Sequence, residues 1–360
     1  PAPLVVGDLP VSTDLGRHSR LMVLAVHPDD ESVAAAGLLR RAVTRGAAVR
    51  VVFLTDGENN PWPQRAIEQR WTIGPCERRR WGRRRRREVL GALATLGVAP
   101  TDVAFLAFPD QGLTDLLCRA PDDLAARLRG EIAAWRPTLL VGPSPCDTHP
   151  DHSAAGLLLR RALAEPCRAG CDPARLDYLI HAWHRPAAET AAVLTLSPEE
   201  LHLKRRAIRC HATQLYLSAR RFLAAARPVE RFVAPDMARV GRVPLHPVRR
   251  AAWNDGTLTL ALRLKSRPGA FGRAAVYLLD VETPGSGVRV DLSPTRRARS
   301  LPMRNVVSGR PAGEVCCTCT GGRAQLRLES NALVTPRFIK VARRFGFFDE
   351  AGWCEIPRPE

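Results

Sequence analysis

The stretch LMVLAVHPDDE at residues 21–31 decides the fold of this chain. Its first residues are apolar without alternation, which is typical of a parallel strand buried on both faces. Potential metal ligands and proton carriers follow directly: His27, Asp29, Asp30 and Glu31. In an open α/β sheet, ligands bind just beyond the carboxyl ends of the strands, so these residues stand where a site is expected. Taken alone, the same residues also fit a polar turn in which an aspartate caps the following helix.

A second cluster of the same kind follows a later apolar run. Residues 138–142 predict a strand, and the segment PSPCDTHPDH at residues 143–152 follows it. Because the carboxyl ends of parallel strands meet at one edge of a sheet, we expect the two clusters to lie together. This pairing favours a functional site over two unrelated turns.

Together the two clusters supply the residue types that a catalytic zinc site needs. Such a site takes three protein ligands from His, Asp and Glu and leaves a fourth position for water. The predicted ligands of Zn²⁺, or of another divalent metal, are His27, Asp30 and His152. Asp29 is then left as a carboxylate beside the water, with His149 as a second proton-bearing group. Asp151 is expected to orient His149.

Strand and helix patterns alternate through the rest of the chain up to residue 235. Apolar runs predict strands at residues 21–27, 49–55, 103–108, 138–142, 178–183 and 191–196. Helical segments are predicted at residues 32–44, 77–96, 121–135 and 153–164, and after a capping box formed by Ser197 and Glu200. This order predicts an α/β fold with a mostly parallel sheet and flanking helices. No glycine-rich fingerprint follows the first strand, which argues against dinucleotide binding.

The chain divides into regions that differ in residue composition and in the pattern of predicted elements. Residues 1–20 are expected to be an N-terminal arm, and residues 21–235 the α/β domain. Beyond several prolines, short β-like runs separated by Gly, Pro and Ser turns dominate. We therefore predict that residues 245–360 form a smaller β-rich domain, a sandwich or a curled sheet.

The net charge of +18 favours an anionic partner. Much of it is concentrated in the run from Arg78 to Arg87, where a basic helix containing Trp81 offers an alternative function in binding nucleic acid or an anionic surface. A solvated helix face explains the same residues, so we expect no specific nucleic acid.

No run approaches the roughly 18 apolar residues of a membrane span. The N-terminal residues lack the basic and long apolar regions of a signal peptide, and we expect a cytoplasmic protein. The cysteines include no CxxC pair, so a structural zinc ribbon is not expected. Their thiols are expected to be reduced.

Several motifs occur in a fixed order between residues 20 and 235. They are AVHPDDE at 25–31, LTDGE at 54–58, Arg85-x-x-Glu88 before LGV at 96–98, FLAFPDQGL at 105–113, THPDH at 148–152, and Lys204-x-x-Ala207 with His211-x-Thr213-Gln214. In this order they resemble the motifs of the PIG-L/LmbE-type zinc-dependent N-acetylglucosamine deacetylases. Residues 236–360 lie outside the resemblance.

The resemblance implies a Rossmann-like fold and hydrolysis of an acetamide on a sugar or sugar conjugate. By position, the zinc ligands would again be His27, Asp30 and His152, and Asp29 the general base. A protonated His149, its charge favoured by Asp151, would hold the oxyanion. The resemblance also places Arg85 and Asp110 at the substrate, which would be an N-acetylated sugar, a glycoconjugate or a nucleotide sugar.

Other interpretations stay open at this point. The same metal site would serve an amidase acting on a non-acetyl amide, such as a thiol–sugar conjugate. His181 and His184 are interpreted as edge or core residues. His211 matches a motif, but a packing role fits it as well.

Overall fold

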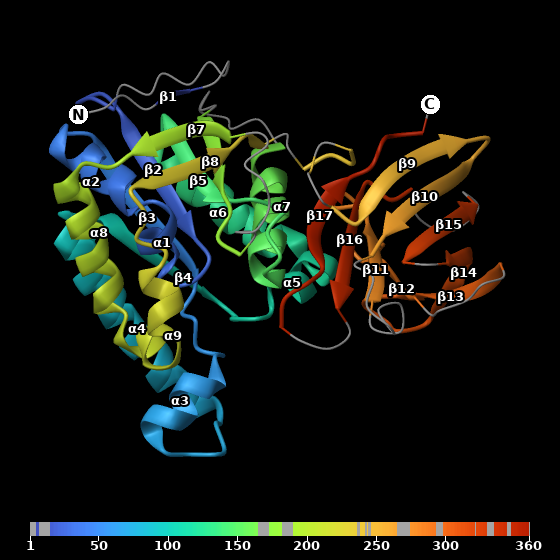
Figure 1. Ribbon diagram of the computed structural model, residues 1–360, viewed down its shortest axis with the longest axis horizontal. Coiled ribbons are helices and arrows are strands. Elements are labelled where there is room, and N and C mark those ends of the chain that lie inside the picture. Colours follow the sequence, from blue (N-terminus) through green and yellow to red (C-terminus); the bar gives the residue numbers. More distant parts are fainter. Residues whose placement is uncertain are drawn as a thin grey trace.

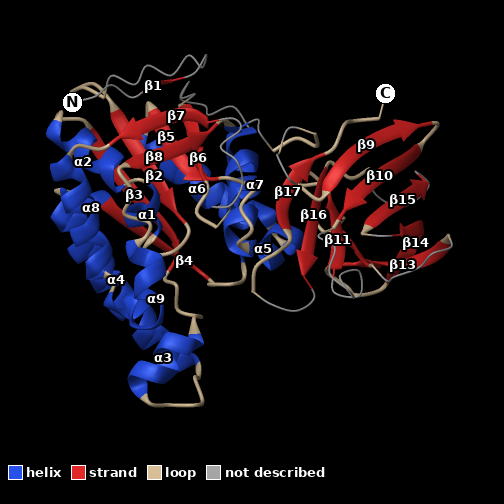
Figure 2. Cartoon of the chain, in the orientation of Figure 1, coloured by secondary structure: helices blue, strands red, loops and turns tan. Residues whose placement is uncertain are grey.

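The computed structural model describes residues 5–6, 15–164, 173–181, 190–235, 238–241, 243, 246–264, 274–292, 298–320, 322–329, 335–343 and 347–359. Within these residues the chain forms two sheets (Figure 1). Helices cover the first sheet, whereas the second consists of strands and loops (Figure 2). Each sheet has an apolar core.

The first sheet has eight strands in the order β1-β7-β8-β6-β5-β2-β3-β4. Their bounds are β1 (Val5–Val6), β2 (Arg20–Ala25), β3 (Ala48–Thr55), β4 (Val103–Phe108), β5 (Leu139–Pro143), β6 (Ala174–Tyr178), β7 (Thr190–Thr195) and β8 (Val229–Val233). The run from β6 to β4 is parallel, and β1, β7 and β8 join it antiparallel. The predicted mostly parallel sheet is confirmed.

Nine helices within the described residues belong to this region. They are α1 (Asp30–Ala34), α2 (Ala36–Thr44), α3 (Pro61–Glu68), α4 (Pro75–Leu96), α5 (Leu113–Arg119), α6 (Pro121–Trp135), α7 (Pro150–Ala164), α8 (Pro198–Cys210) and α9 (Ala212–Leu223).

The central strand β2 is buried on both faces, as its unbroken apolar sequence predicts. Side chains alternate along a strand, so Leu21 and Val23 face one side and Met22 and Leu24 the other. The first pair packs in a core with α2 and α4, and the second in a core with α6 and α7. This packing fixes the carboxyl end of β2, where the polar cluster begins.

The sequence prediction differs from the structure in a few elements. The helix expected at 32–44 is two helices, α1 and α2, that meet at Ala35. The helices α3 and α5 and the strand β8 were not predicted. The strand expected at 178–183 lies earlier, as β6. The expected capping box of Ser197 and Glu200 is present at α8.

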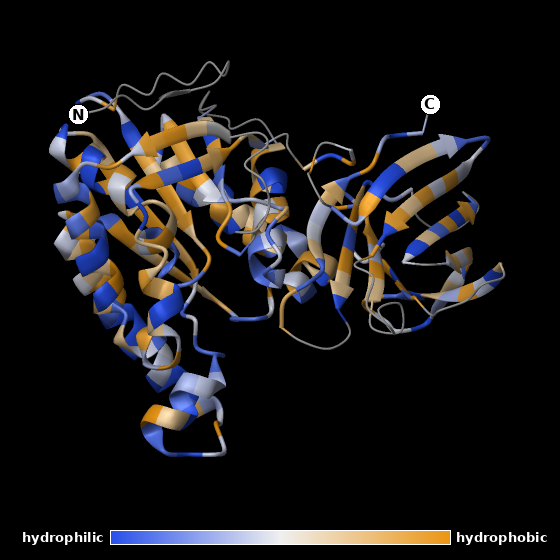
Figure 3. Ribbon diagram, viewed as in Figure 1, coloured by the Kyte–Doolittle hydropathy of each residue, from blue (hydrophilic) through white to orange (hydrophobic). Residues whose placement is uncertain are grey.

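The second sheet is a single antiparallel sheet of nine strands, in the order β17-β16-β11-β12-β13-β14-β15-β10-β9. Their bounds are β9 (Val248–Asn254), β10 (Thr257–Arg263), β11 (Ala274–Leu279), β12 (Val288–Asp291), β13 (Arg299–Asn305), β14 (Pro311–Thr320), β15 (Arg323–Glu329), β16 (Phe338–Arg343) and β17 (Ala351–Glu355). It curls around its own apolar core, and hydrophobic residues alternate with polar ones along β10 and β15 (Figure 3). Of the two expected forms, the structure has the curled sheet.

The two sheets meet along β17. The backbone N–H of Trp353 donates to the carbonyl of Pro145 at 2.7 Å, and the Trp353 side chain lies in the core that α5, α6 and α7 share. We retain residues 21–235 and 245–360 as our proposal for the two domains, preceded by the arm at residues 1–20. Within the arm, the described strand β1 pairs with β7.

The arginine-rich helix α4 is partly neutralised by neighbouring acids. Salt bridges join Arg80 to Glu68 and Arg86 to Asp56. Trp81, the aromatic residue of the proposed basic surface, is fully buried. It therefore belongs to the core of the domain and is not available to a partner on the surface.

None of the helices in the described ranges combines the length and apolarity that a membrane crossing requires. None of the eight cysteines within those ranges forms a disulfide, while Cys167 and Cys171 lie outside them.

A buried ion pair ties α8 to the first sheet. Lys204 lies 2.7 Å from Glu230 of β8, and the Glu230 carboxylate also accepts the backbone N–H groups of Gly37 and Leu38. Both charges are buried. The pair therefore holds α2, α8 and β8 together.

We predict that Lys204→Met lowers the free energy of unfolding by roughly 3–5 kcal/mol, because it leaves a buried carboxylate without its cation. Urea denaturation followed by circular dichroism measures the change. Arg205→Met, at the exposed neighbouring position, is the matched control and should change stability little. Equal stability of the two variants would contradict this role of the ion pair.

Candidate metal and catalytic site

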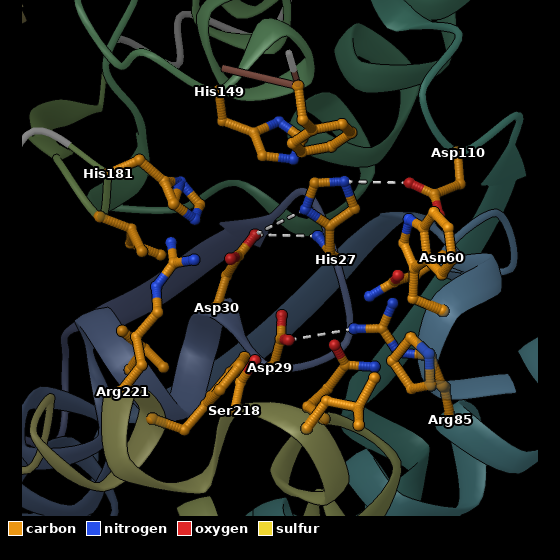
Figure 4. Close-up of a pocket in the computed structure, with 18 of the residues that line it drawn as sticks. His27, Asp29, Asp30, Asn60, Arg85, Asp110, His149, His181, Ser218 and Arg221 are labelled. Atoms are coloured by element: carbon orange, nitrogen blue, oxygen red, sulfur yellow. Dashed lines mark hydrogen bonds and ion pairs between the residues drawn. The ribbon is translucent and has the colours of Figure 1, made fainter. Parts of the chain in front are cut away.

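The polar loops after β2, β3, β4 and β5 meet at one edge of the first sheet. The loop after β2 and the start of α1 carry His27 to Asp30, the next two loops carry Gly57 and Asp110, and the loop after β5 with the start of α7 carries Asp147 to His152. Side chains from these loops line one cavity of about 480 Å³ together with residues of α3, α4 and α9 (Figure 4). The structure therefore brings the two sequence clusters together.

Three ligand-type atoms form a small triangle at the centre of this edge. His27 Nδ1 lies 3.2 Å from His152 Nε2, which lies 3.3 Å from Asp30 Oδ2. The third side, from His27 Nδ1 to Asp30 Oδ2, is 3.8 Å. In a tetrahedral zinc site with bonds of about 2.0–2.1 Å, ligand atoms lie roughly 3.3 Å apart. The triangle therefore fits three ligands of one small cation.

Asp30 is held in place by the strand that precedes it. Its Oδ2 accepts the backbone N–H groups of Val26 at 2.9 Å and His27 at 2.8 Å. Burial would raise the pKa of Asp30, but His152 and His27 together lower it to about 2. The carboxylate is therefore charged and fixed in direction, as a metal ligand requires.

Carboxylates also face the second nitrogen of each imidazole. His152 Nδ1 lies 3.4 Å from Asp147 Oδ2, and His27 Nε2 lies 3.2 Å from Asp110 Oδ1. Histidines that bind metals usually have such an acceptor on the nitrogen away from the metal, which fixes their tautomer. Although burial opposes charge, Asp30 and Asp147 raise the pKa of His152 to about 9. The two imidazoles and the carboxylates that face them therefore both suit the binding of a cation.

Sequence reasoning missed Asp147. This fully buried residue accepts the backbone N–H groups of His149, Ile180 and His181, in addition to facing His152. Despite the burial, positive His181 and His152 hold its pKa well below the usual range. Its position two residues before His149, in the same loop, was the signal available in the sequence.

Other groups of possible ligands lie at the same edge. Within the described residues, three groups each place three ligand atoms within 4.8 Å of one another. The groups are His27 with His149 and His152, Asp147 with His152 and His181, and His27 with Asp110 and Asp151. All of them share an imidazole with the triangle. A group of His and Asp residues at this edge can therefore bind a metal.

Asp29 points into the cavity beside the triangle and is held by Arg85 of α4 (Figure 4). Arg85 Nη2 lies 3.1 Å from Asp29 Oδ2, while Nη1 donates to the carbonyl of Gly57 at 2.8 Å. A Cβ on Gly57, whose φ is +61°, would lie 1.6 Å from Arg85 Nη1, so only glycine leaves room for the guanidinium. Asp29 makes no side-chain capping bond to α1, which rules out the simple capped turn.

The structure changes the expected relation between His149 and Asp151. The backbone N–H of Asp151 donates to His149 Nδ1 at 3.2 Å, so the neutral imidazole carries its proton on Nε2. The carboxylate of Asp151 instead accepts the backbone N–H groups of Gln111 and Leu113 and lies 3.5 Å from His27 Nε2. Asp151 thus orients His149 through its main chain.

The surroundings of His149 do not favour the protonated imidazole that the sequence analysis expected. Burial holds the pKa of His149 well below its ordinary value, and positive charge on the neighbouring His27, His152 and Arg221 lowers it further. A neutral His149 offers an N–H donor without a charge.

The two residues expected at the substrate both line the cavity, but their charged groups have partners in the protein. Arg85 pairs with Asp29 as described. Asp110 accepts the backbone N–H of Asn59 at 2.7 Å and faces His27. Burial would raise the pKa of Asp110, yet the contact with His27 lowers it.

The remaining histidines of the sequence analysis have different surroundings. His181 lines the cavity, and burial lowers its pKa to about 4. His184 lies outside the described residues. His211 is buried and its Nε2 lies 3.0 Å from the hydroxyl of Ser32 and 3.3 Å from Glu31, so it packs behind α1.

The segment that carries these site residues matches a known family model. Residues 22–163 match the family model described as "PIG-L: GlcNAc-PI de-N-acetylase". A 1D-myo-inositol 2-acetamido-2-deoxy-alpha-D-glucopyranoside deacetylase of Corynebacterium efficiens is 26% identical over 271 residues, which cover 64% of this chain and 85% of that protein. The enzyme of the same name from Mycobacterium sp. strain KMS is 34% identical over 165 residues, 40% of this chain and 49% of that protein.

Among solved structures, N,N'-diacetylchitobiose deacetylase from Pyrococcus horikoshii is similar with a TM-score of 0.45 and 22% identity, over 60% of this chain and 84% of that one. The family match includes all the residues of the metal triangle and the carboxylates around it. Residues 22–163 of this chain are a PIG-L family domain.

Proposed function

We propose that this protein is a zinc-dependent hydrolase that removes the N-acetyl group from a sugar conjugate of the N-acetylglucosamine type. The observation that carries the proposal is the triangle of His27, Asp30 and His152 with the carboxylate of Asp29 beside it. A metal site next to an available carboxylate is the arrangement that hydrolysis of an amide by water requires.

The metal would be held by His27 Nδ1, Asp30 Oδ2 and His152 Nε2. When bound, a zinc ion supplies Lewis acidity, which polarises a carbonyl and lowers the pKa of water toward about 7. Asp147, Asp110 and Asp151 would keep the two imidazoles in the tautomer that directs a lone pair at the ion.

Asp29 would act as the general base. Its carboxylate faces the cavity and takes a proton as water attacks the acetamide carbonyl. Arg85 holds this carboxylate in one orientation through the 3.1 Å salt bridge. Once the C–N bond breaks, the same group returns the proton to the departing amine, so acetate and the free amino sugar are formed.

His149 would stabilise the negative charge that develops on the carbonyl oxygen. Because Nδ1 accepts from the main chain, Nε2–H is the donor that faces the site. A fixed neutral donor needs no reorganisation during the reaction, and such a donor is worth roughly 3–4 kcal/mol.

The substrate class rests on the cavity and on the relatives. A volume of about 480 Å³ admits a sugar with part of its conjugate. The relatives from Corynebacterium efficiens and Mycobacterium are named as deacetylases of a 2-acetamido-2-deoxyglucopyranoside linked to inositol. The guanidinium of Arg85 is occupied by Asp29, so no observation on this residue favours a phosphate or nucleotide sugar.

The direct test measures acetate release from N-acetylglucosaminyl-inositol, N,N'-diacetylchitobiose and N-acetylglucosamine. We expect release from at least one of them, loss of activity with a chelator, and recovery when Zn²⁺ is added. Release from none of them, or release that persists without metal, would contradict the proposal. Faster hydrolysis of an N-butyryl analogue would favour the amidase acting on other acyl groups.

We predict that Asp29→Asn retains zinc but lowers kcat by roughly 10²-fold or more, since the amide cannot take a proton. Zinc content by mass spectrometry and acetate release are measured on the same sample. Asp115→Asn, at an exposed position on α5, is the control and should behave as wild type. A metal-free Asp29→Asn protein would instead make Asp29 a ligand.

We predict that Asp147→Asn weakens zinc binding by roughly 10- to 100-fold, because the His152 imidazole loses the charge that supports it. The dissociation constant is obtained by competition with a chromophoric chelator, and Asp115→Asn again serves as the control. An unchanged dissociation constant would show that Asp147 only shapes the loop.

A further inference from the structure

Residues 347–350, which precede β17 and are called the β17 turn below, reach into the cavity of the first domain. Phe347 and Phe348 of this turn line the same cavity as His27, Asp29 and Asp30. Both phenylalanines belong to the β-rich region, far outside the segment that matches the family model. The second sheet therefore contributes side chains to the site of the first.

Several contacts fix the β17 turn relative to the loop that follows β5. The backbone N–H of Asp349 donates to the carbonyl of Thr148 at 2.8 Å, and Asp349 pairs with the buried Lys340 at 2.7 Å. On β17, a Cβ on Gly352 would lie 2.3 Å from the carbonyl oxygens of Pro145 and Asp147. The strand therefore touches the main chain of the loop that carries His149.

The two phenylalanines have different surroundings. The ring of Phe347 meets that of His149 edge to face, with centroids 4.7 Å apart. Phe348 packs on His181 at 5.1 Å, and the Arg221 guanidinium lies over its ring at 5.3 Å. Phe348 is thus partly buried, whereas Phe347 is 44% exposed.

Apolar exposure is concentrated at this cavity. Six large hydrophobic side chains are exposed within the described residues, and three of them, Trp62, Leu217 and Phe347, line it. An exposed apolar group that lines a cavity is typical of a binding surface. A ligand at the donor of His149 would lie near Phe347, because the two rings are in contact and line the same cavity.

We propose that Phe347 is a specificity-determining residue that the C-terminal sheet supplies to the active site. It selects conjugates that present an apolar surface next to the sugar, such as an aryl or alkyl group at the anomeric carbon. This inference rests on the proposed deacetylase function. An aromatic contact of this kind changes affinity by about three- to tenfold.

The test compares kcat and KM for N-acetylglucosamine and its phenyl β-glycoside. We expect wild type to have the lower KM for the glycoside. In Phe347→Ala the ratio of this KM to the KM for the free sugar should rise about three- to tenfold. Phe347→Leu keeps an apolar side chain, so its KM for the glycoside should lie between those of wild type and Phe347→Ala.

Tyr216→Ala is the matched control, because Tyr216 is also an exposed aromatic but does not line the cavity. Zinc content and melting temperature of each variant show that it is folded and loaded with metal. If the ratio of the KM for the glycoside to the KM for the free sugar is unchanged in Phe347→Ala, the inference is overturned. An equal fall in kcat on both substrates with no change in this ratio would also overturn it, because Phe347 would then only support His149.

Binding of phenyl β-glucosaminide, the deacetylated product, separates this inference from the proposed function. Calorimetry measures it without turnover. If wild type releases no acetate yet binds this compound more tightly than Phe347→Ala does, the deacetylase proposal fails and the apolar contact stands. If acetate is released and the two proteins bind the compound equally, Phe347 does not select the substrate.

Discussion

A single carboxylate oxygen, Asp30 Oδ2, connects the fold of this protein to its site. It accepts the N–H groups of Val26 and His27 at the end of β2, and it also lies within 4 Å of both imidazoles of the triangle. Its position is therefore set by the backbone of the central strand, which cores on both faces hold in place. Any shift of β2 would move the proposed metal ligand with it.

The charges around this oxygen explain why the edge of the sheet suits a cation. Two buried imidazoles face four carboxylates, those of Asp30, Asp147, Asp110 and Asp151. Buried charge of one sign is costly unless opposite charge balances it. Protons on the imidazoles balance part of it in the metal-free protein, which agrees with the raised pKa of His152. A divalent cation would balance the same carboxylates.

Local motifs made the fold class and the core of the site predictable. His27 and Asp30 directly follow one apolar run, and His152 lies in the polar segment that follows another, so strand ends and candidate ligand types could both be read from the sequence. Contacts between distant residues could not be read in this way. Asp147 reaches Ile180 and His181, Arg85 reaches Asp29, and Phe347 reaches His149 only after the chain has folded. The lowered pKa of His149 depends on the burial that folding imposes on it and on the charges around it.

A crystal structure of the zinc-loaded protein, with data collected on both sides of the zinc absorption edge, tests the central claim most directly. The account predicts one anomalous peak within about 2.0–2.2 Å of His27 Nδ1, Asp30 Oδ2 and His152 Nε2. A peak bound by Asp147, His152 and His181, or by His27, Asp110 and Asp151, would contradict it.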